Sequence, residues 1–176
     1  VLVAGTGINV DTSDGLDRSE DALLVAFSPE GEMLRATDLD LAASDNRSDD
    51  KGRLMAVDPQ DNVYMVVHQY EVIDDQGETG SWLVSFDHNG ERRWKQQISD
   101  DEDVRGMAWH QGRVYTTGGQ TLAHDANGRE TLRIAHPDAP RRSIDFADNG
   151  DIVVAGSGSV SRYTANGEQR WQYASN

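Results

Sequence analysis

The chain has 176 residues, of which 36% are hydrophobic and 27% are charged, and its formal net charge is −15. Phosphate backbones and anionic lipids repel so acidic a surface, so we expect neither nucleic acid nor an anionic membrane as a partner. The absence of cysteine excludes disulfides, zinc–thiolate sites and thiol catalysis. No apolar run reaches the roughly 18 residues of a membrane span. The chain starts at Val1 rather than at a methionine, which predicts a processed or trimmed product.

The first predicted element is the apolar run at the start of the chain. Val1-Leu-Val-Ala-Gly-Thr-Gly7 matches Ile152-Val-Val-Ala-Gly-Ser-Gly158 nearly position for position, and the runs 63–67 and 114–118 fall in the same register. These runs are rich in β-branched and aromatic residues, which favour strands. A helix is disfavoured because no apolar period of about 3.6 residues is sustained. Near-copies of one strand indicate a repeat architecture.

The second repeated feature is an aromatic residue or His, then three residues, then Gly. Its four copies are Phe27–Gly31, Phe86–Gly90, His124–Gly128 and Tyr163–Gly167. Three copies contain Asn-Gly, which predicts two-residue type I′ hairpin turns because both residues tolerate positive φ. We expect the large apolar residues that follow these turns or end a strand to anchor the core: Trp94, Trp109, Leu132 and Trp171.

The third repeated feature is an Arg-led apolar run. Its copies are Arg53–Val57, Arg105–Trp109 and Arg142–Phe146. Each repeat thus holds four strands: the Arg-led run, the Val-rich run, a strand ending in the aromatic residue or His, and a polar strand after the Gly turn. The polar strand suits an outer edge, because charges discourage edge-to-edge pairing.

Short antiparallel strands at this period predict an all-β fold, a β-propeller of four-stranded blades. We expect about four blades in a single partial propeller domain over 1–176, with approximate bounds 1–45, 46–99, 100–136 and 137–176. The first blade lacks its innermost strand, and no segment is left to supply it. We therefore expect missing blades or a second chain, in a homodimer, to complete the ring.

The repeats resemble those of bacterial β-propeller proteins. Val57-Asp58, Asn62-Val63-Tyr64, Trp82–Phe86 and Asn89-Gly90 look like the repeat of secreted bacterial propellers, and the ending Asn-Gly-Glu-Gln-Arg-Trp171 is similar to quinoprotein-like repeats. The resemblance covers nearly the whole chain. It implies a propeller fold and assigns no catalytic or cofactor residue, because these repeats are structural.

One face of the predicted propeller carries two long acidic loops, 6–21 and 70–80, and long loops on a rigid scaffold commonly carry function. We expect Arg53, Arg105 and Arg142 to converge near the mouth of the channel, where guanidinium groups suit a carboxylate or phosphate ligand. The alternative is that each arginine pairs with an acidic neighbour and bridges blades. Trp82, beside the second loop, is the tryptophan that we expect to be exposed, and we assign it with the three arginines to the candidate ligand-binding site.

The first acidic loop contains oxygen-bearing residues at alternating positions. Asn9, Asp11, Ser13, Asp17 and Glu20 stand at positions 1, 3, 5, 9 and 12 of a calcium-loop pattern. Gly15 falls at position 7 rather than 6, and strands replace the usual flanking helices. An ordinary solvated acidic loop is the alternative.

The leading interpretation is a non-catalytic binding or scaffold module located outside the cytoplasm (periplasmic, surface or secreted). It would present a surface for a protein or a small anionic ligand on the face with the acidic loops. One alternative is a fragment of a quinoprotein-like enzyme whose catalytic residues lie outside this chain. The other is a calcium-dependent adhesion or scaffold protein, for which calcium would be the cofactor.

Overall fold

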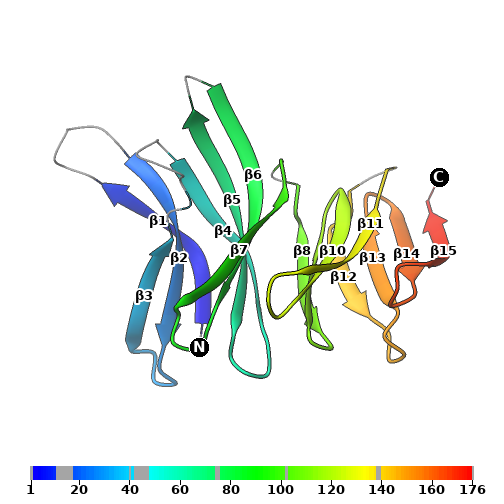
Figure 1. The fold of residues 1–176 in the computed structure, drawn as a ribbon, viewed down its shortest axis with the longest axis horizontal. Helices are drawn as coiled ribbons and strands as arrows, with labels where there is room; N and C mark the ends of the chain where they lie inside the picture. The colour runs from blue at the N-terminus through cyan, green and yellow to red at the C-terminus, as the bar shows by residue number, and fades with distance from the viewer. Residues whose placement is uncertain are drawn as a thin grey trace. The chain divides into compact units, whose positions relative to one another are not determined.

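The computed structural model describes residues 2–10, 18–39, 41, 48–73, 76–101, 103–137 and 140–175. These residues form strands β1–β15 in four antiparallel sheets, one of three strands and three of four, which confirms the all-β propeller fold (Figure 1). In this described part of the chain no helix is long and apolar enough to cross a bilayer. The chain divides into two compact units: unit 1 is Val1–Met55 with Val63–Glu102, and unit 2 is Ala56–Asn62 with Asp103–Asn176.

Unit 1 contains two sheets. Sheet A has the order β1-β2-β3 and sheet B the order β4-β5-β6-β7. The strands of sheet A are β1 (Leu2–Val10), β2 (Arg18–Phe27) and β3 (Met33–Leu39). The strands of sheet B are β4 (Ser48–Val57), β5 (Val63–Ile73), β6 (Gln76–Phe86) and β7 (Arg92–Ser99). Sheet A is the predicted first blade without an innermost strand.

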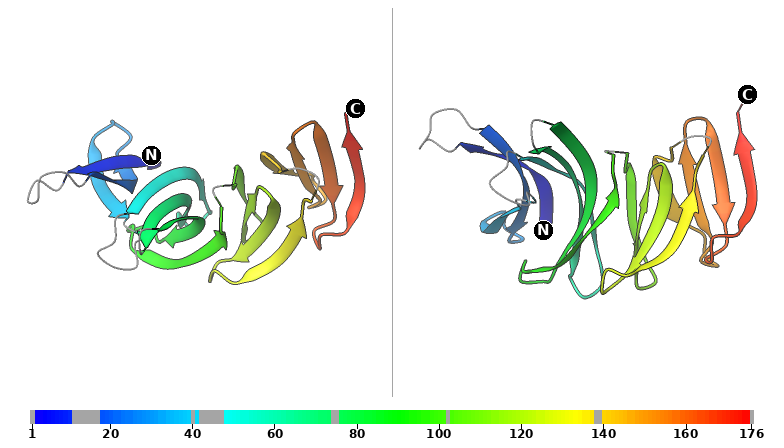
Figure 2. Two further views of the ribbon diagram at one scale, coloured as in Figure 1. Left: turned by 90° about the horizontal axis from the view of Figure 1, so that it is seen from above. Right: turned by 45° about the horizontal axis from the view of Figure 1, so that its top comes forward.

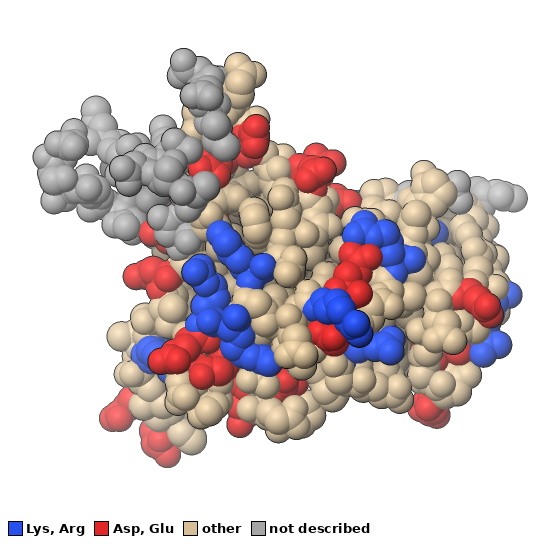
Figure 3. Space-filling model, in the orientation of Figure 1, with Lys and Arg blue, Asp and Glu red and all other residues tan. Residues whose placement is uncertain are grey.

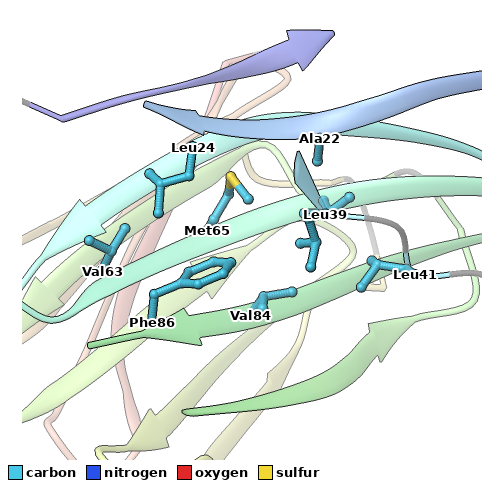
Figure 4. Packing of buried hydrophobic residues seen from close by; sticks show 9 residues of the cluster. Ala22, Leu24, Leu39, Leu41, Val63, Met65, Val84 and Phe86 are labelled. Atoms are coloured by element: carbon cyan, nitrogen blue, oxygen red, sulfur yellow. The ribbon is translucent and has the colours of Figure 1, made fainter. Parts of the chain in front are cut away.

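The core of unit 1 lies between sheets A and B. Alternate residues of each strand face it, as the two-residue period of a strand requires. Ala22 and Leu24 of β2 meet Met65 of β5 and Val84 and Phe86 of β6, all at most 2% exposed (Figure 4). Leu39 and Leu41 close the same cluster. The apolar face of sheet A is therefore buried by sheet B.

Unit 2 contains sheets C and D. Sheet C has the order β11-β10-β9-β8 and sheet D the order β12-β13-β14-β15 (Figure 2). The strands of sheet C are β8 (Gly106–His110), β9 (Arg113–Thr117), β10 (Gln120–Asp125) and β11 (Glu130–Ala135). The strands of sheet D are β12 (Ser143–Phe146), β13 (Ile152–Gly156), β14 (Ser159–Tyr163) and β15 (Gln169–Ala174).

The core of unit 2 lies between sheets C and D. Tyr115, Ala123 and Ile134 of sheet C pack against Ile152, Val154 and Tyr163 of sheet D. Phe146 stacks on His110 with ring centroids 4.0 Å apart and meets Tyr115 edge-on at 4.7 Å. Aromatic contacts of this kind add to the burial of apolar area. The innermost strands of the two sheets are thus joined by packed rings.

The turns after the aromatic residue or His differ from the predicted type I′ geometry. Only their glycines have positive φ, between 75° and 88°, and a bulge follows in the ladder. A type I turn closed by a left-handed Gly has this pattern. The residue after the aromatic or His fixes the turn, because its side-chain oxygen accepts from the backbone N–H groups two and four residues on. These residues are Ser28, Asp87, Asp125 and Thr164.

The two predicted acidic loops of unit 1 are largely strand. β1 extends to Val10 and β2 begins at Arg18, while β5 extends to Ile73 and β6 begins at Gln76. The β5–β6 ladder is continuous from Val63↔Phe86 to Ile73↔Gln76. The prediction of long loops over 6–21 and 70–80 is therefore wrong. Cross-strand hydrogen bonding extends both hairpins beyond the apolar runs that marked the strands in the sequence.

The predicted tryptophan anchors have different surroundings. Trp94 on β7 and Trp109 on β8 are half-buried, and Trp94 lies 5.9 Å from the ring of Tyr64. Trp171 on β15 is 46% exposed, so its predicted place in the core is wrong. Every residue of β15 is exposed. The aromatic side chain of an outer strand is buried only where a second element covers it.

Candidate functional site

The three predicted arginines lie at the starts of innermost strands or within one. Arg105 and Arg142 directly precede β8 and β12, and their backbone N–H groups donate to Thr117 O (2.8 Å) and Ala155 O (2.7 Å). This equivalence follows from the repeat. Arg53 lies within β4 of unit 1. All three are exposed, and among the described residues their guanidinium groups form no hydrogen bond or ion pair.

Trp82 lies inside β6 rather than at the edge of a loop. Its side chain is half-buried against the core of unit 1. The indole Nε1 donates to Gln69 Oε1 at 2.8 Å, and Lys95 Nζ lies 4.9 Å from the ring centroid. The ring therefore has an apolar, a polar and a cationic neighbour within unit 1.

The candidate calcium residues fall mostly outside the described part of the chain. Asp11, Ser13 and Asp17 are not among the described residues, and of Asn9 only the backbone is described, paired with Ser19. The Glu20 carboxylate binds Lys51 Nζ at 3.0 Å. In the described ranges no group of three or more His, Asp or Glu side chains is arranged to hold a metal ion.

A buried polar cluster between sheets C and D is the most unusual site in unit 2. Arg141 is 2% exposed and donates from Nη1 to Ser159 Oγ and from Nη2 to Ser161 Oγ (3.4 Å). His136 is 5% exposed, and its Nε2 hydrogen-bonds Thr121 Oγ1 at 2.8 Å. The hydroxyl of Thr121 in turn meets that of Thr117 at 2.8 Å. An arginine without a carboxylate partner is rarely so deeply buried.

Backbone hydrogen bonds fix the segments that carry His136 and Arg141 to the same turn. His136 N donates to Gly119 O (3.0 Å) and Arg141 N to Gly118 O (2.7 Å), so both are fixed to the β9–β10 turn. Asp103 accepts from Gly119 N at 2.8 Å and forms no hydrogen bond or ion pair with Arg141. The segment that leads from sheet C into sheet D is thus fastened to sheet C before β12 begins.

The electrostatics of the cluster follow from burial and from the Arg141 charge. Burial and then the neighbouring Arg141 lower the pKa of His136 to about 4. His136 is therefore neutral at pH 7, and one positive charge remains. Among the described residues no acidic side chain pairs with Arg141, and its Nε and His136 Nδ1 have no hydrogen-bond partner.

A second buried charge in sheet D shows the usual arrangement. The Asp151 carboxylate, 4% exposed, accepts from Arg162 Nε at 2.8 Å and from Arg170 Nε at 2.6 Å. Burial raises its pKa, but the hydrogen bonds from Arg170, Asn149 and Arg162 outweigh this and hold the pKa below its ordinary value. Asp151 has two cationic partners, whereas the described partners of the Arg141 side chain are serine hydroxyls.

Sequence reasoning identified Arg142 and missed Arg141. The register that equates Arg105 with Arg142 also equates Val104 with Arg141, and the strand pairings equate Leu122 with Ser161. Val104 and Leu122 are 6% and 2% exposed. A charged residue at a position where the neighbouring repeat has a buried valine was the available signal.

No protein-family model matches the sequence, and no curated protein matches it. The structure is similar to BamB from Moraxella catarrhalis, with a TM-score of 0.60 and 14% identity over 99% of this chain and 52% of that one. It is also similar to a protein of unknown function from Bacteroides caccae, with a TM-score of 0.55 and 10% identity over 97% of this chain and 57% of that one.

A third similar structure is a gluconolactonase from Xanthomonas campestris, with a TM-score of 0.50 and 12% identity over 94% of this chain and 60% of that one. The chain thus spans between half and two thirds of the length of these proteins. Such distant likeness establishes the β-propeller fold and no activity.

Proposed function

We propose that the chain is part of a non-catalytic β-propeller module outside the cytoplasm, which binds a protein partner through the end of unit 1 that carries its long hairpins. The β5–β6 hairpin is the observation that supports this most. Its strands have 11 residues each, whereas those of unit 2 have four to six. A long hairpin that extends beyond a packed sheet can present side chains to a partner without removing any from the hydrophobic core.

The chemistry of this hairpin favours a cationic partner. Residues 70–80 include Glu71, Asp74, Asp75 and Glu78 and no Lys or Arg. Tyr70 is 42% exposed and Glu78 is exposed, whereas Glu71 is buried. Figure 3 shows Asp and Glu side chains around the β5–β6 hairpin, while Lys and Arg gather lower on the same face of unit 1. Exposed aromatic and acidic groups together suit a basic peptide segment.

The experiment shortens the β5–β6 hairpin and keeps the rest of sheet B unchanged. Replacing residues 70–79 by Asn-Gly joins Gln69 to Gly80, which are already paired opposite each other. The matched control, Asn127→Ser, changes a turn of unit 2. A lysine-rich peptide of about 20 residues is the probe, and binding is measured by calorimetry at two salt concentrations. We expect at least tenfold weaker binding for the shortened chain and no change for the control; equal binding by all three proteins contradicts the proposal.

A small anionic ligand is the second candidate. It is favoured by the exposed guanidinium groups of Arg105 and Arg142 at equivalent places in unit 2, which have no partner within the described ranges. Guanidinium groups recognise carboxylates and phosphates through paired hydrogen bonds. Arg105→Ala should weaken such binding at least tenfold in a calorimetric titration with citrate, and Arg113→Ala is the control. Unchanged citrate affinity in Arg105→Ala would remove this candidate.

We also propose that another blade covers the outward face of sheet D, from further sequence or from a second copy of the chain. This face carries Val153, Ala155, Val160, Trp171 and Tyr173, of which Trp171 and Tyr173 are 46% and 66% exposed. Exposed aromatic residues beside each other are typical of interfaces. The molar mass from light scattering separates the two sources: a dimer that Tyr173→Arg disrupts supports a second copy, and a monomer at all concentrations supports further blades.

A further inference from the structure

The cluster around Arg141 has hydrogen-bond donors without acceptors. Arg141 Nε–H has no partner, and the Ser161 hydroxyl, which accepts from Arg141 Nη2, has no acceptor for its own proton among the described residues. Ser159, by contrast, accepts from Arg141 and donates to Gly156 O at 3.0 Å. When Thr121 donates to His136 Nε2, the imidazole proton is on Nδ1, which also has no partner.

The charge of the cluster is also unbalanced. Removing a guanidinium ion from water is costly unless an opposite charge and hydrogen bonds replace the water. Here the described partners are two serine hydroxyls. In sheet C the equivalent positions hold Val104 and Leu122, so the fold accepts an apolar pair there. The blade geometry therefore does not require an arginine at this position. A counter-ion would lower the cost of burying its charge.

We propose that a small monovalent anion, of the size of chloride or formate, binds beside Arg141 between sheets C and D. Arg141 supplies the charge, and the Ser161 hydroxyl and His136 supply further hydrogen bonds. The burial of the site sets the size of the anion: Ser161 and Thr121 are 0% exposed, Arg141 2% and His136 5%. A divalent ion would be much harder to desolvate there.

The position of this site also gives it a role. Arg141 begins the segment that enters β12, and its hydroxyl partners lie on β14. Its backbone is bound to the β9–β10 turn of sheet C. An anion that satisfies Arg141 therefore strengthens the junction of two blades. This anion site is separate from the hairpin of unit 1 and does not depend on the proposed protein partner.

The test compares the thermal unfolding of the chain in sodium chloride and in sodium gluconate at equal ionic strength. Both salts screen the acidic surface equally, but gluconate is too large for a closed site. We expect the native chain to melt about 5 °C or more higher in chloride at a hundredfold excess over the dissociation constant. Equal melting temperatures in the two salts overturn the proposal.

Variants separate the site from general salt effects. The double variant Arg141→Val with Ser161→Leu copies the apolar pair of sheet C and should melt equally in both salts. Arg142→Val, which alters the exposed neighbour, and Asp138→Asn, which removes an acidic residue three positions before Arg141, should keep the difference. A chloride effect that persists in the double variant, or that arises only in Asp138→Asn, overturns the proposal.

A second measurement covers the case in which the double variant does not fold. Crystals of the native chain grown in sodium bromide should show an anomalous peak within hydrogen-bonding distance of the Arg141 guanidinium. A peak there supports the site, and bromide elsewhere only, or none, overturns it.

Discussion

Strands β1 and β13 begin with nearly the same sequence and end differently. Val1–Gly7 and Ile152–Gly158 are near copies. β13 ends at Gly156 and turns through Ser157 and Gly158, with φ of 44° and 77°, directly into β14. β1 continues through Gly7, which pairs with Asp21, and reaches Val10. Local sequence therefore does not set the length of these strands.

The surroundings of the equivalent glycines explain part of this difference. A Cβ atom on Gly156 would lie 2.6 Å from Pro140 O and 2.8 Å from Arg142 N, whereas a Cβ on Gly5 would have no atom within 4 Å. Sheet D has an innermost strand, and the backbone that enters it crosses Gly156. Sheet A has no such strand among its described residues. The backbone that approaches Gly5 is that of Gly52 on β4 of sheet B, on the side away from the Gly5 Cβ position, which stays open. The repeat specifies the blade, and the neighbouring segment specifies where a strand must stop.

The largest expected effect concerns His136, in the segment that leads from sheet C into sheet D. Because burial and Arg141 lower the pKa of His136 from 6.5 to about 4, the folded chain binds fewer protons there than the unfolded chain between these pH values. The contribution of His136 to the free energy of unfolding is therefore fully present above about pH 6.5 and is lost as pH falls to 4. The loss amounts to about 3 kcal/mol.

His136→Gln tests this contribution. The free energy of unfolding of the native chain, measured with urea in chloride-free buffer from pH 7 to 4, should fall by about 3 kcal/mol more than that of His136→Gln. The many carboxylates titrate equally in both proteins, so the difference between them reports His136. Parallel pH profiles would show that His136 is accessible to protons in the folded chain.

The next effect is steric and compares the two glycines directly. Gly156→Ala should lower the free energy of unfolding by about 2 kcal/mol, because its Cβ would collide with backbone atoms that cannot rotate away. Gly5→Ala is the matched control and should change stability by less than about 0.5 kcal/mol. Chemical denaturation of both variants measures this, and an equal cost in both would mean that the two strands have the same surroundings after all.

The sequence predicted the framework of the fold from residues whose role is local. Phe86, His124 and Tyr163 are buried at the predicted ends of their strands. The Arg-led runs at 105–109 and 142–146 become β8 and β12. Alternating apolar residues and turn glycines act over a few positions, so a single sequence is enough to find them.

Features that depend on distant neighbours could not be predicted in the same way. The extension of β5 and β6 over 70–80 pairs Tyr70–Ile73 with Gln76–Thr79, and the second of these segments is polar and carries no apolar signal. The burial of Arg141 depends on the hydroxyls of Ser159 and Ser161, 18 and 20 residues away. The candidate site was therefore placed one residue away from the side chain that is buried.

A smaller effect is expected where the two copies differ in backbone conformation. Gly158 has φ of 77°, a region that is strained for any residue with a Cβ, whereas Gly7 lies in an extended strand. Gly158→Ala should cost about 1 kcal/mol. Gly7→Ala should be neutral or stabilise by about 0.5 kcal/mol, because an alanine strand residue loses less entropy on folding. Thermal unfolding of the two variants measures the difference; a cost of equal size in Gly7→Ala would imply a turn at that position.

The smallest expected effect concerns the outer strands and tests how far the sheets are covered. Trp171→Ala should change the free energy of unfolding of this chain by less than about 0.5 kcal/mol, because the side chain is 46% exposed. Trp94→Ala, at the equivalent place on β7, should cost about 2 kcal/mol, since its half-buried ring meets Tyr64.

If a second copy covers sheet D, the cost of Trp171→Ala should rise with protein concentration, because association then contributes to stability. Urea denaturation at two concentrations a hundredfold apart measures this, and a large cost at the lower one would mean that Trp171 is buried within a single chain.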